Sequence, residues 1–326
     1  MVTRLCSAAG LSAYIVLAAS AFAQTSPKPP ETVVVTGQRV DDKALNSIVS
    51  QFIDVHAARN RKTGQYMRDA AGPICPITEG LPPAFNAFVT ARVLKVAHDV
   101  GAPTDASGTC KPNVEILFTD QPQVVVDALA KRTNGAILGM HFIHESSRLM
   151  LVTHPIQGWY VTGSRYAENA IEPVLSVSAD GRTTKPGDDK SLGVDDAYHN
   201  APERVFLGSN IPMRRVSTIV NALIIVDTSK LAGHEIGPVS DYITMLALSQ
   251  PASLDACNAF PSILDLMSDD CGAREKPQAL TESDIAYLKG LYMADLGAVN
   301  VSTQKDSIAG GMKDNLGDPS KPAPRP

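Results

Sequence analysis

The residues with the clearest chemical potential lie in the short run Gly233-His234-Glu235-Ile236-Gly237. A histidine followed directly by a glutamate is the first half of the pattern H-E-x-x-H, in which two histidines one helical turn apart bind zinc and the glutamate is the general base. In this chain Pro238 stands where the second histidine would be. Proline binds no metal, and it breaks a helix interior but suits a first turn. We therefore expect His234 and Glu235 to lie in a turn before a helix, without the geometry of a zinc pair.

Two predicted elements position this segment. Residues 216–226 form an almost uninterrupted apolar run, which predicts a buried strand. A connection over residues 227–237 then leads into a helix that we expect to begin at Pro238. Apolar residues recur in this helix at the spacing i, i+3, i+4, i+7 and i+8, which predicts one buried face: Val239, Tyr242, Ile243, Leu246 and Ala247.

Asp241 lies within the same helix and is the remaining candidate for a rearranged metal site. In that alternative, His234 and Asp241 would be metal ligands and Glu235 the catalytic residue of a metal-dependent peptidase. Catalytic zinc requires three protein ligands around an open position. Because the second histidine is missing, the sequence favours a protein with no cofactor and no catalytic residue, and the peptidase is kept as the alternative.

A second group of potential ligands consists of His141, His144, Glu145 and His154. On a strand, side chains three residues apart point to opposite faces, so His141 and His144 would not converge on one ion. The spacing favours histidines that are solvated or hydrogen-bonded over a metal site.

The periodicity of the remaining chain alternates between helix and strand. Helices are expected over residues 41–58, from Pro82-Pro83 to residue 100, and over 121–132, and strands over 113–118, 140–153 and 159–161. In the helix after Pro83 the expected buried stripe is Phe85, Phe88, Val89, Val93, Val96 and Ala97. Near the C-terminus, Thr281 and Asp284 have the spacing of a capping box, which predicts the start of a final helix. Together these elements predict an α+β fold.

Two further segments follow the central helix. The first is Pro261-Ser262-Ile263-Leu264-Asp265-Leu266-Met267, and the second matches the form L-T-x-x-D-x-x-x-L-x-x-L-Y through Leu280, Thr281, Asp284, Leu288, Leu291 and Tyr292. In both segments, and in the order of its elements from about residue 82 to residue 295, the chain resembles the zincins, and within them the metzincins. The run Ser240-Asp241-Tyr242-Ile243-Thr244-Met245 also resembles a run in uncharacterised exported bacterial proteins.

The zincin resemblance implies a mixed sheet packed against helices, with a central helix after the last core strand and a C-terminal helix. It also implies a degenerate member, a pseudoenzyme, because the chain departs from the metzincin pattern at its metal site. Asp241 stands where that pattern has glycine, and Thr244 stands where it has the third histidine.

The N-terminus predicts export. Arg4 precedes an apolar stretch over residues 10–22, and Ala21-Phe22-Ala23 fits a signal-peptidase site. We expect a signal peptide over residues 1–23, a disordered leader over 24–40, one domain over 41–297 and a disordered tail over 298–326. The mature protein is then periplasmic or secreted. Since no later stretch is long and apolar enough, no membrane span is expected.

Charge and cysteine content constrain partners and redox state. The formal net charge is -5, with no block of Lys and Arg, which argues against nucleic acid as a partner. Four cysteines remain after the predicted cleavage, and an even number in an oxidising compartment favours disulfides. Three pairings are open, of which we favour the one closest in sequence: Cys75 with Cys110 and Cys257 with Cys271. A zinc site is disfavoured, because no C-x-x-C spacing occurs.

Two segments are candidates for contact with protein partners. The run from Glu31 to Arg39 (Glu31-Thr32-Val33-Val34-Val35-Thr36-Gly37-Gln38-Arg39) resembles the TonB box of outer-membrane receptors, although the chain is too short for a 22-stranded barrel. We expect an unstructured leader, with transient strand pairing to a periplasmic partner as the remaining alternative. The segment from Ala179 to Ala201 is rich in Gly, Asp, Lys and Pro, which predicts a long exposed loop.

Overall fold

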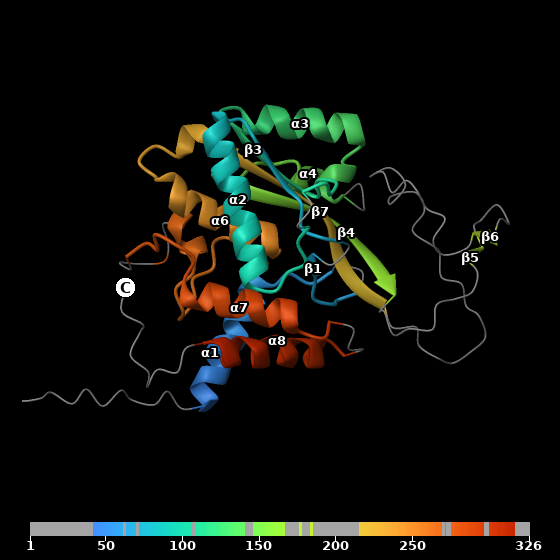
Figure 1. Cartoon of the computed structure of the whole chain (residues 1–326), viewed down its shortest axis with the longest axis vertical. Coiled ribbons are helices and arrows are strands. Elements are labelled where there is room, and N and C mark those ends of the chain that lie inside the picture. The colour runs from blue at the N-terminus through green and yellow to red at the C-terminus, as the bar shows by residue number, and fades with distance from the viewer. Residues whose placement is uncertain are drawn as a thin grey trace, which may run out of the picture. The chain divides into compact units, whose positions relative to one another are not determined.

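A mixed sheet of five strands lies at the centre of the part of the chain that the structure, a computed structural model, describes (Figure 1). That part comprises residues 42–60, 63–69, 72–105, 108–140, 146–166, 176–177, 183–184, 215–268, 271, 275–296 and 300–316. The predicted signal peptide and leader lie outside it, as does the segment from Ala179 to Ala201 apart from β6 (Thr183–Thr184), which pairs with β5 (Ser176–Val177). The α+β fold class is confirmed.

The long strand β7 (Arg215–Asp227) is the central element of this sheet. It pairs in parallel with β1 (Arg68–Asp69) and with β3 (Val114–Thr119), and β3 pairs in parallel with the edge strand β2 (Pro76–Glu79). On its other side β7 pairs antiparallel with β4 (Ile156–Tyr166). The predicted strand over residues 216–226 is therefore confirmed.

Both faces of β7 are buried, which explains its continuous apolar sequence. On one face Ile224 and Val226 join the main core, which the helices α1, α2, α6, α7 and α8 complete. On the other face Leu223 and Ile225 join a smaller cluster with Trp159 of β4.

The helices have the bounds α1 (Asp42–His56), α2 (Pro83–Asp99), α3 (Pro122–Thr133), η1 (Ala136–Leu138), α4 (Ser146–Leu149), η3 (Thr228–Lys230), α6 (Ile236–Leu248), η4 (Ile263–Met267), α7 (Glu282–Met293) and α8 (Val301–Asn315).

The central helix α6 begins at Ile236, two residues before Pro238, so the proline occupies its first turn. The predicted apolar face is buried, and so is the rest of the helix from Pro238 to Leu248. Its buried serine and threonine hydroxyl groups are satisfied within the helix: the Ser240 hydroxyl donates to the Ile236 carbonyl at 2.6 Å, and the Thr244 hydroxyl donates to the Ser240 carbonyl at 2.7 Å. The helix is thus enclosed between the sheet and its neighbouring helices.

The predicted capping box of Thr281 and Asp284 is present at the start of α7. The Asp284 carboxylate accepts hydrogen bonds from the Thr281 N–H and hydroxyl, both at 2.9 Å. The same carboxylate also accepts from the Ser262 hydroxyl at 2.7 Å and from the Ile263 N–H at 2.8 Å. One buried side chain therefore fixes the beginnings of both α7 and η4.

The disordered tail predicted from residue 298 is wrong over residues 301–315, which form α8. Ile308 and Met312 of this helix are fully buried in the main core. Gly310-Gly311 reads as a flexible sequence, but Gly311 lies at the contact with α7, where a Cβ would come within 2.8 Å of the Gly290 Cα. Gly311 therefore lets α7 and α8 pack closely, and the folded domain continues through α8.

Two other expectations also need correction. Of the predicted strand over 140–153, Ser146–Leu149 forms the short helix α4. Three of its four residues are polar, and the Leu149 carbonyl at its end accepts a hydrogen bond from the Trp159 indole N–H at 2.6 Å. In α2, Phe85 and Phe88 belong to the predicted buried stripe but are 47% and 46% exposed. They lie at the N-terminal end of the helix, whereas the buried positions begin at Val89.

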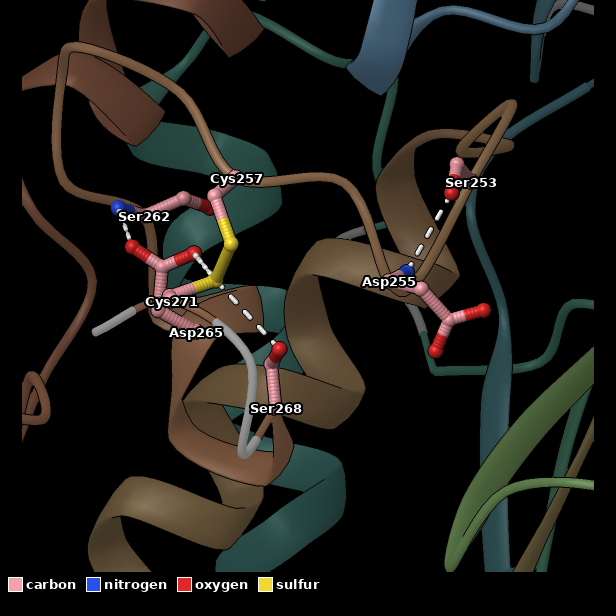
Figure 2. The surroundings of a disulfide bond; sticks show 7 residues. All are labelled: Ser253, Asp255, Cys257, Ser262, Asp265, Ser268 and Cys271. Atoms are coloured by element: carbon pink, nitrogen blue, oxygen red, sulfur yellow. Dashed lines mark hydrogen bonds between the residues drawn. A yellow bond between two sulfur atoms is a disulfide. The ribbon is translucent and has the colours of Figure 1, made fainter.

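Both predicted disulfides are present, with Cα–Cα separations of 6.0 Å for Cys75–Cys110 and 5.3 Å for Cys257–Cys271. Figure 2 shows the second bond beside the capping pair of η4, in which the Ser262 N–H donates to Asp265 at 3.1 Å. This disulfide therefore ties the loop after α6 to the segment after η4. Among the described helices, none has the length and hydropathy needed to cross a membrane.

Candidate functional site

The half-motif lies on the surface, immediately before α6. Glu235 is the N-cap residue of the helix, and its side chain makes no capping hydrogen bond. The His234 N–H donates to the Leu231 carbonyl at 3.0 Å, and Gly233 between them adopts a φ of 88° that favours glycine. Both side chains are exposed. The expectation that His234 and Glu235 lie in a turn before the helix is confirmed.

Asp241 lies apart from this pair, inside the fold, with 3% of its surface exposed. Its carboxylate forms a bidentate ion pair with Arg92 of α2, through the Nε of the guanidinium and through Nη2 at 2.9 Å. It also accepts from the Leu280 N–H, just before α7, at 2.9 Å. The pKa of Arg92 is raised by this hydrogen-bonded carboxylate. Asp241 thus joins α2, α6 and the approach to α7, and both of its oxygens are occupied by donors.

A groove of about 380 Å³ opens above this ion pair, between α2 and the start of α6. Phe88, Lys95 and Gly237 line it together with Arg92 and Asp241. Lys95 is paired with Asp99 one helical turn away at 2.6 Å. His234 and Glu235 are not among the lining residues, so the groove does not bring the three candidate metal-site residues together.

Within the described ranges, no group of three or more His, Cys, Asp and Glu side chains is placed to hold a metal ion. Of the second predicted group, His154 hydrogen-bonds through Nε2 to Asp255 at 2.9 Å. His141, His144 and Glu145 lie outside the described residues.

A second, smaller pocket of about 170 Å³ lies beside β4. One wall is formed where the chain after α1 runs along the end of α6, since the Ala58 N–H donates to the Gln250 carbonyl at 2.7 Å. This contact brings Arg59 and Gln250 into the pocket lining. The other described lining residues are Asn60, Met67, Leu138, Gly139, Leu149, Gly158, Trp159, Tyr160, Thr162 and Pro251.

Gln250 also has a buried polar atom without a partner. Its side-chain oxygen Oε1 is buried and has no hydrogen-bond partner among the described residues. A buried acceptor without a donor is costly, and native proteins contain few of them. Sequence reasoning did not identify Gln250, Arg59 or Arg92, because nothing local distinguishes them from other surface polar residues.

Two buried ionisable groups have displaced pKa values. Burial raises the pKa of Asp284 to about 6, although its four hydrogen bonds favour the charged form. Burial lowers the pKa of His56 to about 4, although its Nδ1 lies 2.8 Å from the Phe52 carbonyl. Asp284 caps helices and His56 stacks on Phe52, so both groups serve the fold and neither lines the two pockets.

No protein-family model, curated protein or solved structure matches this chain.

Proposed function

We propose that this chain is an exported, non-catalytic protein of zincin-like architecture that acts in the cell envelope or outside the cell by binding. The observation that carries the proposal is the position of Asp241. The buried carboxylate is held by Arg92 and by the Leu280 N–H, so it cannot turn towards a metal ion without giving up these hydrogen bonds. His234 and Glu235 lie on the surface instead.

The order of elements supports the zincin-like part of this proposal. A helix, a parallel strand, a second helix, an antiparallel edge strand, a central strand and a buried central helix follow one another as α2, β3, α3, β4, β7 and α6. The short helix η4, which ends at Met267, and the capped helix α7 come next. This is the succession that the resemblance implies.

The disulfides support the compartment. Bonds of this kind persist in oxidising surroundings such as the periplasm or the extracellular space. Cys75–Cys110 and Cys257–Cys271 both link segments of the folded domain. They agree with the signal peptide predicted over residues 1–23.

The metal content of the mature chain, residues 24–326, purified without chelator, tests the proposal. We expect far less than one equivalent of any metal and an unfolding temperature that EDTA does not change. His234→Ala should behave like His98→Ala, a control at a histidine whose side chain is 81% exposed on α2. One equivalent of zinc that is lost in His234→Ala and retained in His98→Ala would overturn the proposal in favour of the peptidase.

A further inference from the structure

We propose that the Cys257–Cys271 bond is a redox-active site, at which a dithiol reductant attacks the Cys257 sulfur of the folded protein while Cys75–Cys110 stays oxidised. The proposal does not rest on the proposed function, because neither cysteine lines the groove above Asp241 or the pocket beside β4. A disulfide is reduced when a thiolate attacks one of its sulfurs and the other sulfur leaves. Access to the first sulfur and stabilisation of the second therefore decide how fast it reacts.

The two disulfides differ first in access. Cys257 is exposed and Cys271 is half-buried. In the other bond Cys110 is also half-buried, but Cys75 is only 8% exposed. A reductant therefore reaches Cys257 without any change of the fold, whereas it reaches Cys75 only after the structure opens locally.

The sulfur that leaves when Cys257 is attacked has a hydrogen-bond donor beside it. The Cys271 sulfur lies 3.3 Å from the Ser268 hydroxyl oxygen (Figure 2). Because a disulfide sulfur carries no hydrogen, the hydroxyl is the donor in this contact and stabilises the negative charge that develops on Cys271. The Asp265 carboxylate, 3.6 Å away, opposes this charge, but solvent weakens the repulsion at a half-buried site. Once the sulfur is protonated, the same carboxylate accepts a hydrogen bond from the thiol.

The sulfur that would leave from the other bond lies in less favourable surroundings. Attack at the half-buried Cys110 would place the negative charge on Cys75. Its sulfur lies 3.0 Å from the Cys110 carbonyl oxygen, an acceptor that repels such a charge. Cys75 is also fixed in place, since its N–H donates to the Asn113 side chain at 2.8 Å and its carbonyl accepts from the Asn113 N–H at 3.1 Å. A charge at a buried position is costly, so this bond should react slowly from either end.

Other contacts hold the Cys257–Cys271 loop when its disulfide is open. Before Cys257, the Ala252 N–H donates to the Val55 carbonyl at 2.8 Å, and Asp255 contacts His154 at 2.9 Å. Within the loop, η4 packs three buried apolar side chains into the main core. Reduction should therefore be local and reversible, with the fold retained.

The reductant supplies two electrons. Its thiolate bonds to the Cys257 sulfur, the S–S bond breaks, and the electron pair of that bond goes to the Cys271 sulfur, which takes a proton from water. The second thiol of the reductant, as a thiolate, then attacks the mixed disulfide and releases Cys257, which is protonated in turn. The protein ends with two thiols and the reductant with one disulfide.

Dithiothreitol is the probe for the reduction rates. The mature chain would be treated under native conditions, quenched with acid and alkylated with N-ethylmaleimide, and each bond would be followed by peptide mass spectrometry. We expect Cys257–Cys271 to be reduced at least about tenfold faster than Cys75–Cys110, with unchanged circular dichroism. Equal rates, faster reduction of Cys75–Cys110, or unfolding that accompanies the reduction of Cys257–Cys271 would overturn the proposal.

Glutathione, which has a single thiol, identifies the sulfur that is attacked. Trapped intermediates should carry glutathione on Cys257 and N-ethylmaleimide on Cys271. The reverse distribution would contradict the proposed direction of attack.

Serine variants test the role of the hydroxyl beside Cys271. Ser268→Ala should slow the reduction of Cys257–Cys271 roughly threefold or more, and Ser268→Thr, which keeps a hydroxyl, should restore the rate. Ser253→Ala is the matched control, because the Ser253 hydroxyl instead accepts from the Asp255 N–H at 3.2 Å (Figure 2). It should react like the wild type, and reduction of Cys75–Cys110 should be the same in all three variants. A Ser268→Ala variant that reacts like the wild type would overturn the assignment of Cys271 as the leaving sulfur.

Discussion

Gly290 of α7 and Gly311 of α8 meet where the two helices touch, and a Cβ added to Gly290 would lie 2.6 Å from both the Ile308 carbonyl oxygen and the Met312 nitrogen. Those atoms belong to the backbone of α8, which can only move as a helix. Together with the burial of Ile308 and Met312 in the main core, this close approach holds α8 against the domain.

Alanine should therefore have opposite effects at Gly290, which lies in this contact, and at Gly310, which lies outside it. Gly290→Ala should lower the free energy of unfolding by about 1–3 kcal/mol, because the helices must separate. Gly310→Ala is the matched control: its Cβ meets no atom within 4 Å, so it should be neutral or raise stability by up to about 1 kcal/mol through helix propensity. Urea denaturation of both variants measures the difference. Equal effects at the two sites would contradict the described packing.

The Arg92–Asp241 pair should matter far more to stability than its neighbour on the same helix. Asp241→Asn should reduce the free energy of unfolding by roughly 1–3 kcal/mol, because the variant weakens the contacts of α6 to α2 and to Leu280. This range already allows for screening of the ion pair by solvent, since Arg92 is partly exposed. Asp99→Asn removes the exposed pair with Lys95 and should leave stability unchanged within error. Chemical denaturation under the same conditions compares the two. A neutral Asp241→Asn would show that the pair is dispensable.

The pH dependence of stability should contain two opposing contributions between about pH 4 and pH 6. Asp284 has its pKa raised from 3.8 to about 6 by burial, so the folded state binds more protons in this window and its contribution to stability decreases as pH rises. His56 has its pKa lowered from 6.5 to about 4, so the folded state binds fewer protons and its contribution increases as pH rises. Each is on the order of 3 kcal/mol across its full window, and the two nearly offset.

Single variants should separate these two slopes. Asp284→Asn should leave a protein whose stability increases from pH 4 to pH 6.5, and His56→Gln should leave one whose stability decreases from pH 4 to pH 6. The readout is the slope of the unfolding free energy against pH, not its absolute value, because both substitutions also disturb packing. Identical slopes in the wild type and in both variants would contradict the pKa values.

The two disulfides should differ in their contributions. The Cys75–Cys110 bond spans 35 residues and the Cys257–Cys271 bond spans 14. Loop entropy predicts that removing the Cys75–Cys110 bond, which closes the longer loop, lowers the free energy of unfolding by about 4 kcal/mol. Removing the Cys257–Cys271 bond should lower it by about 3 kcal/mol. Double Cys→Ser variants compared by denaturation test the order. Non-reducing peptide mapping supplies the control, and a peptide that links Cys75 to Cys257 would refute the pairing.

The parts of the fold that sequence reasoning predicted are those with local signals. The apolar run of β7, Pro238 in the first turn of α6, and the capping box of Thr281 and Asp284 each depend on residues close together in the chain. The missed helix α8 shows the limit of such signals, because a glycine pair such as Gly310-Gly311 is equally compatible with a flexible tail and with a close contact between helices. Only the position of Gly290 across the interface decides between them.

The candidate site depended even more on distant residues. Arg92 and Asp241 are separated by 149 positions in the chain, so no local pattern could predict that Asp241 is held in an ion pair. Gln250 becomes noticeable only because the folded chain buries its side-chain oxygen. The half-motif was visible in the sequence because its residues are consecutive. The contacts that separate Asp241 from His234 and Glu235 join residues far apart in the chain, so they were not visible.

The central place of β7 in the sheet has a consequence for biosynthesis. β7 is the last of the five strands to be made, yet β4 pairs with no other strand of that sheet, and β3 has one of its two edges against β7. A nascent chain that stops before residue 215 therefore carries strand edges that have no partner, and unpaired edges promote aggregation. The sheet therefore cannot be completed until the chain has been made past residue 227, and an exported chain that stays unfolded until then avoids exposing these edges.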